Sequence, residues 1–267
     1  MSRFWILHFE MRDIAMAKNN KLNGVKRKFK KLAIIFLFLL FLATAIFWLY
    51  AQVKTYPAET ESLEAILEHE KVKISEESNH FYLLPETIDH SILPIIFYPG
   101  GLVAPEAYLY KMGRVAICLQ TTVYIVKSPF NAPIFSVNTA GKIIKKYNLD
   151  RVWVGGHSLG GISACRFTSG NPEKVFGLFL FGSYCDRDIS EFSGKVISIM
   201  GLKDQIINRE NYQKAKSNLP LNVNHLEIIG LNHSDFGDYG QQSGDGASSL
   251  DNEQIIEIIC RVFLENT

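Results

Sequence analysis

The hexapeptide Gly-His-Ser-Leu-Gly-Gly at residues 156–161 constrains the fold of this chain more than any other segment. It follows an apolar, strand-like run at residues 151–154 and opens a helical pattern at residues 159–169. Glycines on both sides of Ser158 relieve crowding, so the serine can occupy a sharp, strained turn. In such a turn the hydroxyl projects above a sheet at a helix N-terminus, where developing negative charge is favoured. The segment therefore predicts a strand-turn-helix unit with Ser158 as nucleophile.

The rest of the body alternates apolar runs with helical patterns. Six runs are predicted strands, at residues 93–98, 122–126, 151–154, 176–181, 196–200 and 225–229. Helices are predicted at residues 105–119, 137–147, 159–169, 209–217 and 252–264. Two earlier strand candidates, at residues 71–75 and 80–84, are separated by polar residues that favour a hairpin. This alternation predicts an α/β fold built on a doubly wound, mostly parallel sheet.

A serine hydroxyl becomes a good nucleophile only with a base in reach and an acid that orients the base. In strand-turn-helix sites of this kind the acid and then the histidine follow the nucleophile along the chain. Asp204 comes just after the predicted strand at residues 196–200, and His233 just after the one at residues 225–229. Because reactive groups gather at the carboxyl ends of parallel strands, we predict Ser158, Asp204 and His233 as a catalytic triad.

Other acids and histidines fit this arrangement less well. Asp186 or Asp188, after the preceding strand, is the main alternative for the acid. His157 flanks the nucleophile and cannot readily face it, while His225 begins its strand at the wrong end. Three further histidines precede the nucleophile, contrary to the expected order: His69, His80 and His90.

An oxyanion hole requires two backbone N–H donors, one from the residue after the nucleophile and one from the loop after an earlier strand. The first is predicted to be Leu159. The second is expected in Pro-Gly-Gly-Leu at residues 99–102, directly after the strand at residues 93–98. The paired glycines let the backbone turn an amide toward the site, and we predict Leu102 as the donor.

Residues 32–51 form an uncharged apolar run of the length that a helix needs to cross the hydrocarbon core of a membrane. Lysines and arginines crowd residues 26–31 before it, and Trp48 and Tyr50, which suit the membrane interface, lie at its end. We predict a single-pass helix in the cell membrane with the basic tail in the cytoplasm and the catalytic domain outside it. The small residues Ala43 and Ala45 leave a cleaved signal peptide as the alternative, but the apolar run continues past them and favours an uncleaved anchor.

The predicted organisation is a basic cytoplasmic tail at residues 1–31, a transmembrane helix at 32–51, a linker with a short helix at 52–69, and a catalytic domain at 70–267. The tail carries nine Lys/Arg and two acidic residues, whereas the remainder carries nineteen Lys/Arg and twenty-five acidic residues. An acidic body offers no basic surface for nucleic acid. The expected partners are the lipid bilayer and a small acyl substrate, and the oligomeric state is left open.

The four cysteines lie far apart in the sequence: Cys118, Cys165, Cys185 and Cys260. They form no C-x-x-C motif and no Cys/His cluster, so we expect no metal site. Buried free thiols are the default interpretation. A domain outside the cytoplasm would allow a disulfide, but the spacing does not select the partners.

These features resemble the α/β-hydrolase superfamily, and more narrowly the alpha/beta hydrolase fold-5 group of small bacterial hydrolases, which are similar to dienelactone hydrolases. The resemblance extends from about residue 94 to the end of the last helix. Five segments carry it: residues 98–103 with Pro105 and Tyr108, residues 129–131 with Phe135, residues 155–161, residues 201–204, and residues 232–246, which include Phe-Gly-Asp-Tyr-Gly and Gly-Asp-Gly. Leu231 departs from the pattern, because a second glycine is expected before Asn-His.

The resemblance implies a triad of Ser158, Asp204 and His233 on a sheet of about eight strands with little or no lid. Together with the residues, it predicts a serine esterase that forms an acyl-enzyme and needs no metal or organic cofactor. Two alternatives stay open, an acyltransferase using the same triad and a catalytically inactive, membrane-anchored binding protein. The sequon Asn-His-Ser would place a glycan beside His233 in a eukaryotic secretory route, which favours a bacterial setting.

Overall fold

The computed structural model describes residues 2–266, with side chains from residue 27 onward. The chain divides into two units, Met1–Val53 and Lys54–Thr267. Helix α1 (Ser2–Lys54) accounts for the described residues of the first unit and ends at the first residue of the second. Within the described residues, the 28-residue stretch Arg27–Lys54 of α1 is long and apolar enough to cross a membrane, a property shared by single-pass anchors and signal sequences.

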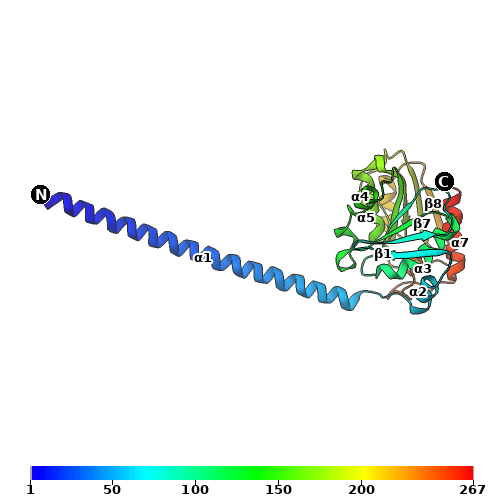
Figure 1. Cartoon of the computed structure of the whole chain (residues 1–267), viewed down its shortest axis with the longest axis horizontal. Helices are drawn as coiled ribbons and strands as arrows, with labels where there is room; N and C mark the ends of the chain where they lie inside the picture. Colours follow the sequence, from blue (N-terminus) through cyan, green and yellow to red (C-terminus); the bar gives the residue numbers. More distant parts are fainter. Residues whose placement is uncertain (1, 267) are drawn as a thin grey trace. The chain divides into compact units, whose positions relative to one another are not determined.

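The second unit is built on one eight-stranded sheet with the order β1-β2-β4-β3-β5-β6-β7-β8. Figure 1 shows the helices of this unit packed around its strands. Its strands are β1 (Val72–Glu76), β2 (His80–Pro85), β3 (Ile95–Tyr98), β4 (Val123–Val126), β5 (Val152–His157), β6 (Val175–Phe181), β7 (Lys195–Gly201) and β8 (Asn224–Ile228). β1 and β2 form an antiparallel hairpin, β2 pairs antiparallel with β4, and all later pairings are parallel. The predicted doubly wound, mostly parallel sheet is confirmed.

Helices cover both faces of this sheet because its central strands are apolar on both sides. Helix α3 (Leu109–Leu119), preceded by a 3-10 turn (Pro105–Tyr108), packs with α2 (Thr60–Leu67) and α7 (Asn252–Leu264) on one side. Helices α4 (Thr139–Lys146) and α5 (Leu159–Gly170) pack on the other, and α6 (Arg209–Ala215) lies between β7 and β8 in the sequence. The two faces give two apolar clusters, one around Trp153 and one around Phe167.

Both pairs of cysteines form disulfides within the second unit. Cys118 of α3 is joined to Cys260 of α7, across 142 residues of sequence. Cys165 of α5 is joined to Cys185 in the loop after β6. The default expectation of free thiols was therefore wrong, and the permitted alternative of disulfides is what the structure shows. Each bridge ties helices or loops that cover the same face of the sheet.

Candidate active site

Ser158 occupies the tight turn between β5 and α5, as the Gly-His-Ser-Leu-Gly-Gly sequence predicts. Its backbone has φ +52° and ψ −121°, a conformation that L-residues rarely adopt. A Cβ atom at Gly156 would lie 2.3 Å from the Tyr98 carbonyl oxygen, and one at Gly160 would lie 2.0 Å from the same oxygen. Glycine is required on both sides because the turn presses against the end of β3. The serine is held in its strained conformation by this packing.

Asp204 and His233 meet at the ends of β7 and β8. Nδ1 of His233 lies 2.8 Å from Oδ2 of Asp204, and the two side chains are 1% and 0% exposed. The other carboxylate oxygen, Oδ1, accepts hydrogen bonds from the amides of Ile206 and Ile207, each at 2.9 Å. Burial raises the pKa of Asp204, but the hydrogen bond and charge of His233 and the two amides outweigh it and hold the pKa below its ordinary value. Asp204 is therefore ionised and orients the imidazole.

The ends of β5, β6 and β7 bring Ser158 close to this pair. The Ser158 amide donates to the Phe181 carbonyl at 3.0 Å, at the end of β6. The next residue, Gly182, is so close to the pair that an added Cβ would lie 3.1 Å from Nδ1 of His233 and 3.3 Å from Oδ2 of Asp204. The three residues predicted as a triad thus gather at the carboxyl edge of the sheet, where chemistry is expected in this type of fold.

His157, next to the serine, belongs to a buried series of hydrogen bonds. The Gly100 amide donates to the Tyr108 hydroxyl at 2.9 Å, and that hydroxyl lies 2.8 Å from Nδ1 of His157. Burial, and then the charge of His233, hold the pKa of His157 well below its ordinary value. We therefore assign a neutral imidazole that accepts the Tyr108 proton at Nδ1. These hydrogen bonds link the loop after β3 to His157. The centroid of the His157 ring lies 4.4 Å from the centroid of the His233 ring.

The amides around the turn differ in whether they already have partners. Leu102, predicted as an oxyanion donor, has φ +56° and donates its amide to the Asn131 carbonyl at 2.8 Å. The Gly100 amide is bound to Tyr108. The amides of Gly101 and Leu159 have no hydrogen-bond partner among the described residues, and a Cβ at Gly101 would lie 2.9 Å from Cδ2 of Leu159. Two unbonded amides therefore belong to residues in mutual contact beside Ser158.

The alternative acids lie elsewhere. Asp186 forms a surface ion pair with Arg166, with an N–O distance of 2.6 Å. The Asp188 carboxylate accepts from the amide of Ser190, two residues along the chain. Asp204, by contrast, is hydrogen-bonded directly to His233.

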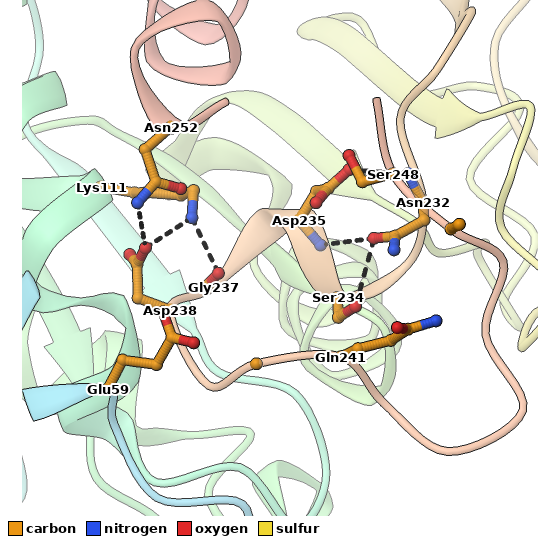
Figure 2. A pocket seen from close by; sticks show the side chains of 12 residues that line it. Glu59, Lys111, Asn232, Ser234, Asp235, Gly237, Asp238, Gln241, Ser248 and Asn252 are labelled. Atoms are coloured by element: carbon orange, nitrogen blue, oxygen red, sulfur yellow. Dashed lines mark hydrogen bonds and ion pairs between the residues drawn. The ribbon is translucent and has the colours of Figure 1, made fainter. Parts of the chain in front are cut away.

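The loop after His233 surrounds a polar cavity of about 330 Å³ that none of the three predicted triad residues lines. Figure 2 shows Lys111 of α3 at this cavity, where its Nζ lies 2.8 Å from Oδ1 of Asp238 and 2.8 Å from the Gly237 carbonyl oxygen. Asn252, at the start of α7, donates to the same Oδ1 atom at 2.8 Å. Lys111 and Asp238 are buried. Their ion pair joins the loop after His233 to α3, and the hydrogen bond from Asn252 joins the same loop to α7. Neither the pair nor the Tyr108 chain was predicted, because a single sequence gives no signal that joins residues this far apart.

Comparison with known proteins places this geometry in a family. A model of the family described as "Alpha/beta hydrolase family" matches residues 94–257. The chain belongs to the alpha/beta hydrolase family. The match confirms the resemblance inferred from the motifs and makes the protein an enzyme of the hydrolase class. No curated protein matches the chain.

Solved structures share the fold at low sequence identity. A predicted CIB-like hydrolase from Thermoplasma acidophilum has 14% identity and a TM-score of 0.57, covering 73% of this chain and all of its own. Carboxylesterase CesB from Bacillus subtilis has 10% identity and a TM-score of 0.55, with 77% of this chain and 94% of the other covered. Naproxen esterase from Bacillus subtilis has 10% identity and a TM-score of 0.54, with 82% and 97% covered. At such identities the likeness establishes the fold of this α/β-hydrolase and nothing about its substrate.

Proposed function

We propose that this α/β-hydrolase is a membrane-anchored serine esterase whose triad is Ser158, His233 and Asp204. The observation that carries the proposal is the buried, hydrogen-bonded pair of His233 and Asp204 at the sheet edge that also presents the strained serine. A buried carboxylate of lowered pKa beside an imidazole is the arrangement that keeps a general base in the correct tautomer. Two structures of this fold are named as esterases, which makes carboxylic esters the first substrates to test.

In the proposed reaction His233 removes the proton of Ser158 as the serine oxygen attacks the ester carbonyl. Asp204 stabilises the imidazolium that forms, and the imidazolium then protonates the leaving alcohol. Water, activated by the same imidazole, hydrolyses the acyl-enzyme and returns the serine to its starting state. For the oxyanion we propose the amides of Leu159 and Gly101 as donors, in place of Leu102, because the Leu102 amide is already bound to Asn131.

We also propose that residues 32–51 are an uncleaved anchor and that the domain at residues 70–267 lies outside the cytoplasm, joined by the linker at residues 52–69. The basic tail at residues 1–31 favours a cytoplasmic N-terminus. The two disulfides support the same orientation, because such bonds persist in oxidising compartments and are rare in the cytosol.

Labelling with a fluorophosphonate tests the chemistry. The probe phosphorylates an activated serine, so full-length protein in detergent micelles is expected to label at Ser158 and hydrolyse short acyl esters. Ser158→Ala is expected to lose both reactions, while Ser163→Ala, which removes another serine of α5, is the matched control. Labelling that persists in Ser158→Ala, or its absence from the intact protein, would reject the function.

Protease added to intact cells tests the orientation. The domain after Gln52 is expected to be digested without lysis, whereas a cytoplasmic control protein is protected. Complete protection in sealed cells followed by digestion after lysis would place the domain on the opposite side of the membrane.

A further inference from the structure

Asp245 lies outside the proposed triad. Its carboxylate accepts four hydrogen bonds, which come from the loop after β7 and from the loop after β8. Its Oδ2 accepts from the Ser234 amide at 2.9 Å and from the Ser234 hydroxyl at 3.1 Å. Its Oδ1 accepts from the Gln205 amide at 3.2 Å and from the Gly246 amide at 2.9 Å. Asp245 is 8% exposed, so these donors replace water as its partners.

Two of the donors are the chain neighbours of the acid and the histidine. Gln205 follows Asp204 after β7, and Ser234 follows His233 after β8. We propose that Asp245 is a positioning residue. By accepting hydrogen bonds from the residues that follow Asp204 and His233 in the chain, it fixes the separation and orientation of these two side chains. The inference rests on the proposed function, because it assigns Asp245 a role in the same reaction.

The contacts of the Asp245 side chain require an acceptor oxygen on each side. All four hydrogen bonds to the Asp245 carboxylate come from N–H or O–H donors, and a carboxylate offers acceptor oxygens on both sides. Asn at this position would keep one acceptor oxygen and turn an NH₂ group toward donors on the other side. Asp245→Asn therefore releases one of the two loops while preserving side-chain size.

A second set of contacts makes the loops rigid enough to transmit this restraint. The Asn232 side chain donates to the Gly246 carbonyl at 2.7 Å, and its Oδ1 accepts from the Asp235 amide at 2.9 Å and from the Ser234 hydroxyl at 3.2 Å (Figure 2 shows the latter two bonds). A Cβ at Gly246 would lie 2.2 Å from the Lys203 carbonyl oxygen. Residues 245–246 thus pack closely against the backbone of Lys203, the residue before Asp204. A shift of Asp245 would therefore move both the loop after β7 and the loop after β8.

The expected effect is on catalytic geometry. A misplacement of about 1 Å in a reacting group costs about 100-fold in rate. We expect Asp245→Asn to lower kcat for an ester, and the rate of fluorophosphonate labelling at Ser158, by about 10- to 100-fold. KM is expected to change by less than about threefold, because an interaction that acts only in the transition state leaves ground-state binding unchanged.

A double-mutant cycle on the full-length chain in detergent micelles tests the inference. Labelling rates are compared for the wild type, Asp245→Asn, Asp204→Asn and the double variant, with Asp251→Asn, which alters the α7 cap, as the matched control. If Asp245 acts through the pair, the loss in the double variant is smaller than the product of the single losses. A wild-type labelling rate in Asp245→Asn, or losses that multiply fully, would overturn the inference.

A spectroscopic readout separates this inference from the proposed function. The proton on Nδ1 of His233, bonded to Asp204, is expected to give a downfield NMR resonance that shifts in Asp245→Asn and stays in Asp251→Asn. If the wild type fails to label at Ser158, the hydrolase function is rejected, and the resonance alone decides the role of Asp245. If Asp245→Asn does not fold, Ser234→Ala, which removes only the hydroxyl contacts, replaces it, and unchanged labelling in that variant would overturn the inference.

Discussion

The Tyr108 hydroxyl lies 2.8 Å from Nδ1 of His157 and also accepts a hydrogen bond from the Gly100 amide. Burial raises the pKa of Tyr108 far above its ordinary value, so the hydroxyl keeps its proton and donates it to the imidazole. A single buried hydroxyl thereby connects the loop after β3 to β5, the strand that ends next to Ser158.

Tyr108→Phe is expected to destabilise the protein and loosen the loop that carries the proposed Gly101 donor. It leaves a buried N–H and a buried ring nitrogen without a partner, at a cost of about 1–3 kcal/mol in unfolding free energy. Chemical denaturation of the full-length chain measures the change. Tyr110→Phe, whose hydroxyl contacts Glu253 at the surface, is the control and is expected to change stability by less than about 0.5 kcal/mol. Equal stability of Tyr108→Phe and the wild type would contradict the assigned hydrogen bonds.

Asp204→Asn is expected to lower kcat by about 10⁴-fold, because an amide favours the wrong imidazole tautomer of His233. Asp186→Asn removes a carboxylate that pairs with Arg166 at the surface and is expected to retain nearly full activity. Steady-state hydrolysis of a short acyl ester compares the two. A large loss in Asp186→Asn with little loss in Asp204→Asn would transfer the role of the acid to the preceding strand.

The positions of these acids show which parts of the site can be read from one sequence. The elbow around Ser158 and the strand ends before Asp204 and His233 are local signals, since apolar runs and glycines mark them within a few residues. The bond from the Leu102 amide to Asn131 was not predictable, because the acceptor comes from the loop after a different strand. The same applies to Asp245, which contacts residues about forty and eleven positions earlier.

The pairing of the cysteines could not be predicted from the sequence for the same reason. Cys118 and Cys260 meet only after α3 and α7 have packed on one face of the sheet, and nothing near either residue in the sequence specifies the other. Strand and helix bounds within the second unit, by contrast, were predicted to within a few residues because they depend on local periodicity. Helix α1 (Ser2–Lys54) is longer than the helix predicted at residues 32–51 and includes most of the basic tail. The fold and the proposed triad can thus be predicted from local patterns, whereas the contacts that hold the three proposed residues depend on tertiary packing.

The reassigned oxyanion donor is tested by replacing single amides with esters. An ester linkage at residue 101, introduced with glycolic acid, removes only the Gly101 N–H and is expected to lower kcat by about 10²- to 10³-fold with little change in KM. The same change at residue 102 removes the bond to Asn131 and is expected to cost less than about tenfold in kcat. If the ester at residue 102 is the more damaging of the two, Leu102 is the donor, as the sequence first suggested.

The pH dependence of stability is expected to report His157. Its pKa is lowered by burial and by the charge of His233, so the folded protein keeps it neutral while the unfolded chain binds a proton below about pH 6.5. Stability from this group is therefore present above pH 6.5 and falls with decreasing pH by up to about 1.4 kcal/mol per unit. His157→Gln is expected to flatten the curve of unfolding free energy between pH 6.5 and 5. Identical slopes for variant and wild type would show that folding does not lower the pKa of His157.

The disulfide between Cys118 and Cys260 is expected to contribute more stability than the one between Cys165 and Cys185. The bridge between Cys118 and Cys260 spans 142 residues of sequence, whereas the bridge between Cys165 and Cys185 spans 20. The conformational entropy that a disulfide removes from the unfolded state grows with the length of the loop it closes. Replacing Cys118 and Cys260 by serine is expected to lower the unfolding free energy by about 4–5 kcal/mol, and replacing the other pair by about 3 kcal/mol. Denaturation of both double variants beside the wild type measures the difference, and maleimide labelling of unreduced, unfolded protein counts free thiols. Four reactive thiols in protein isolated from membranes would show that neither bridge forms, and would remove the support that the disulfides give to an extracytoplasmic domain.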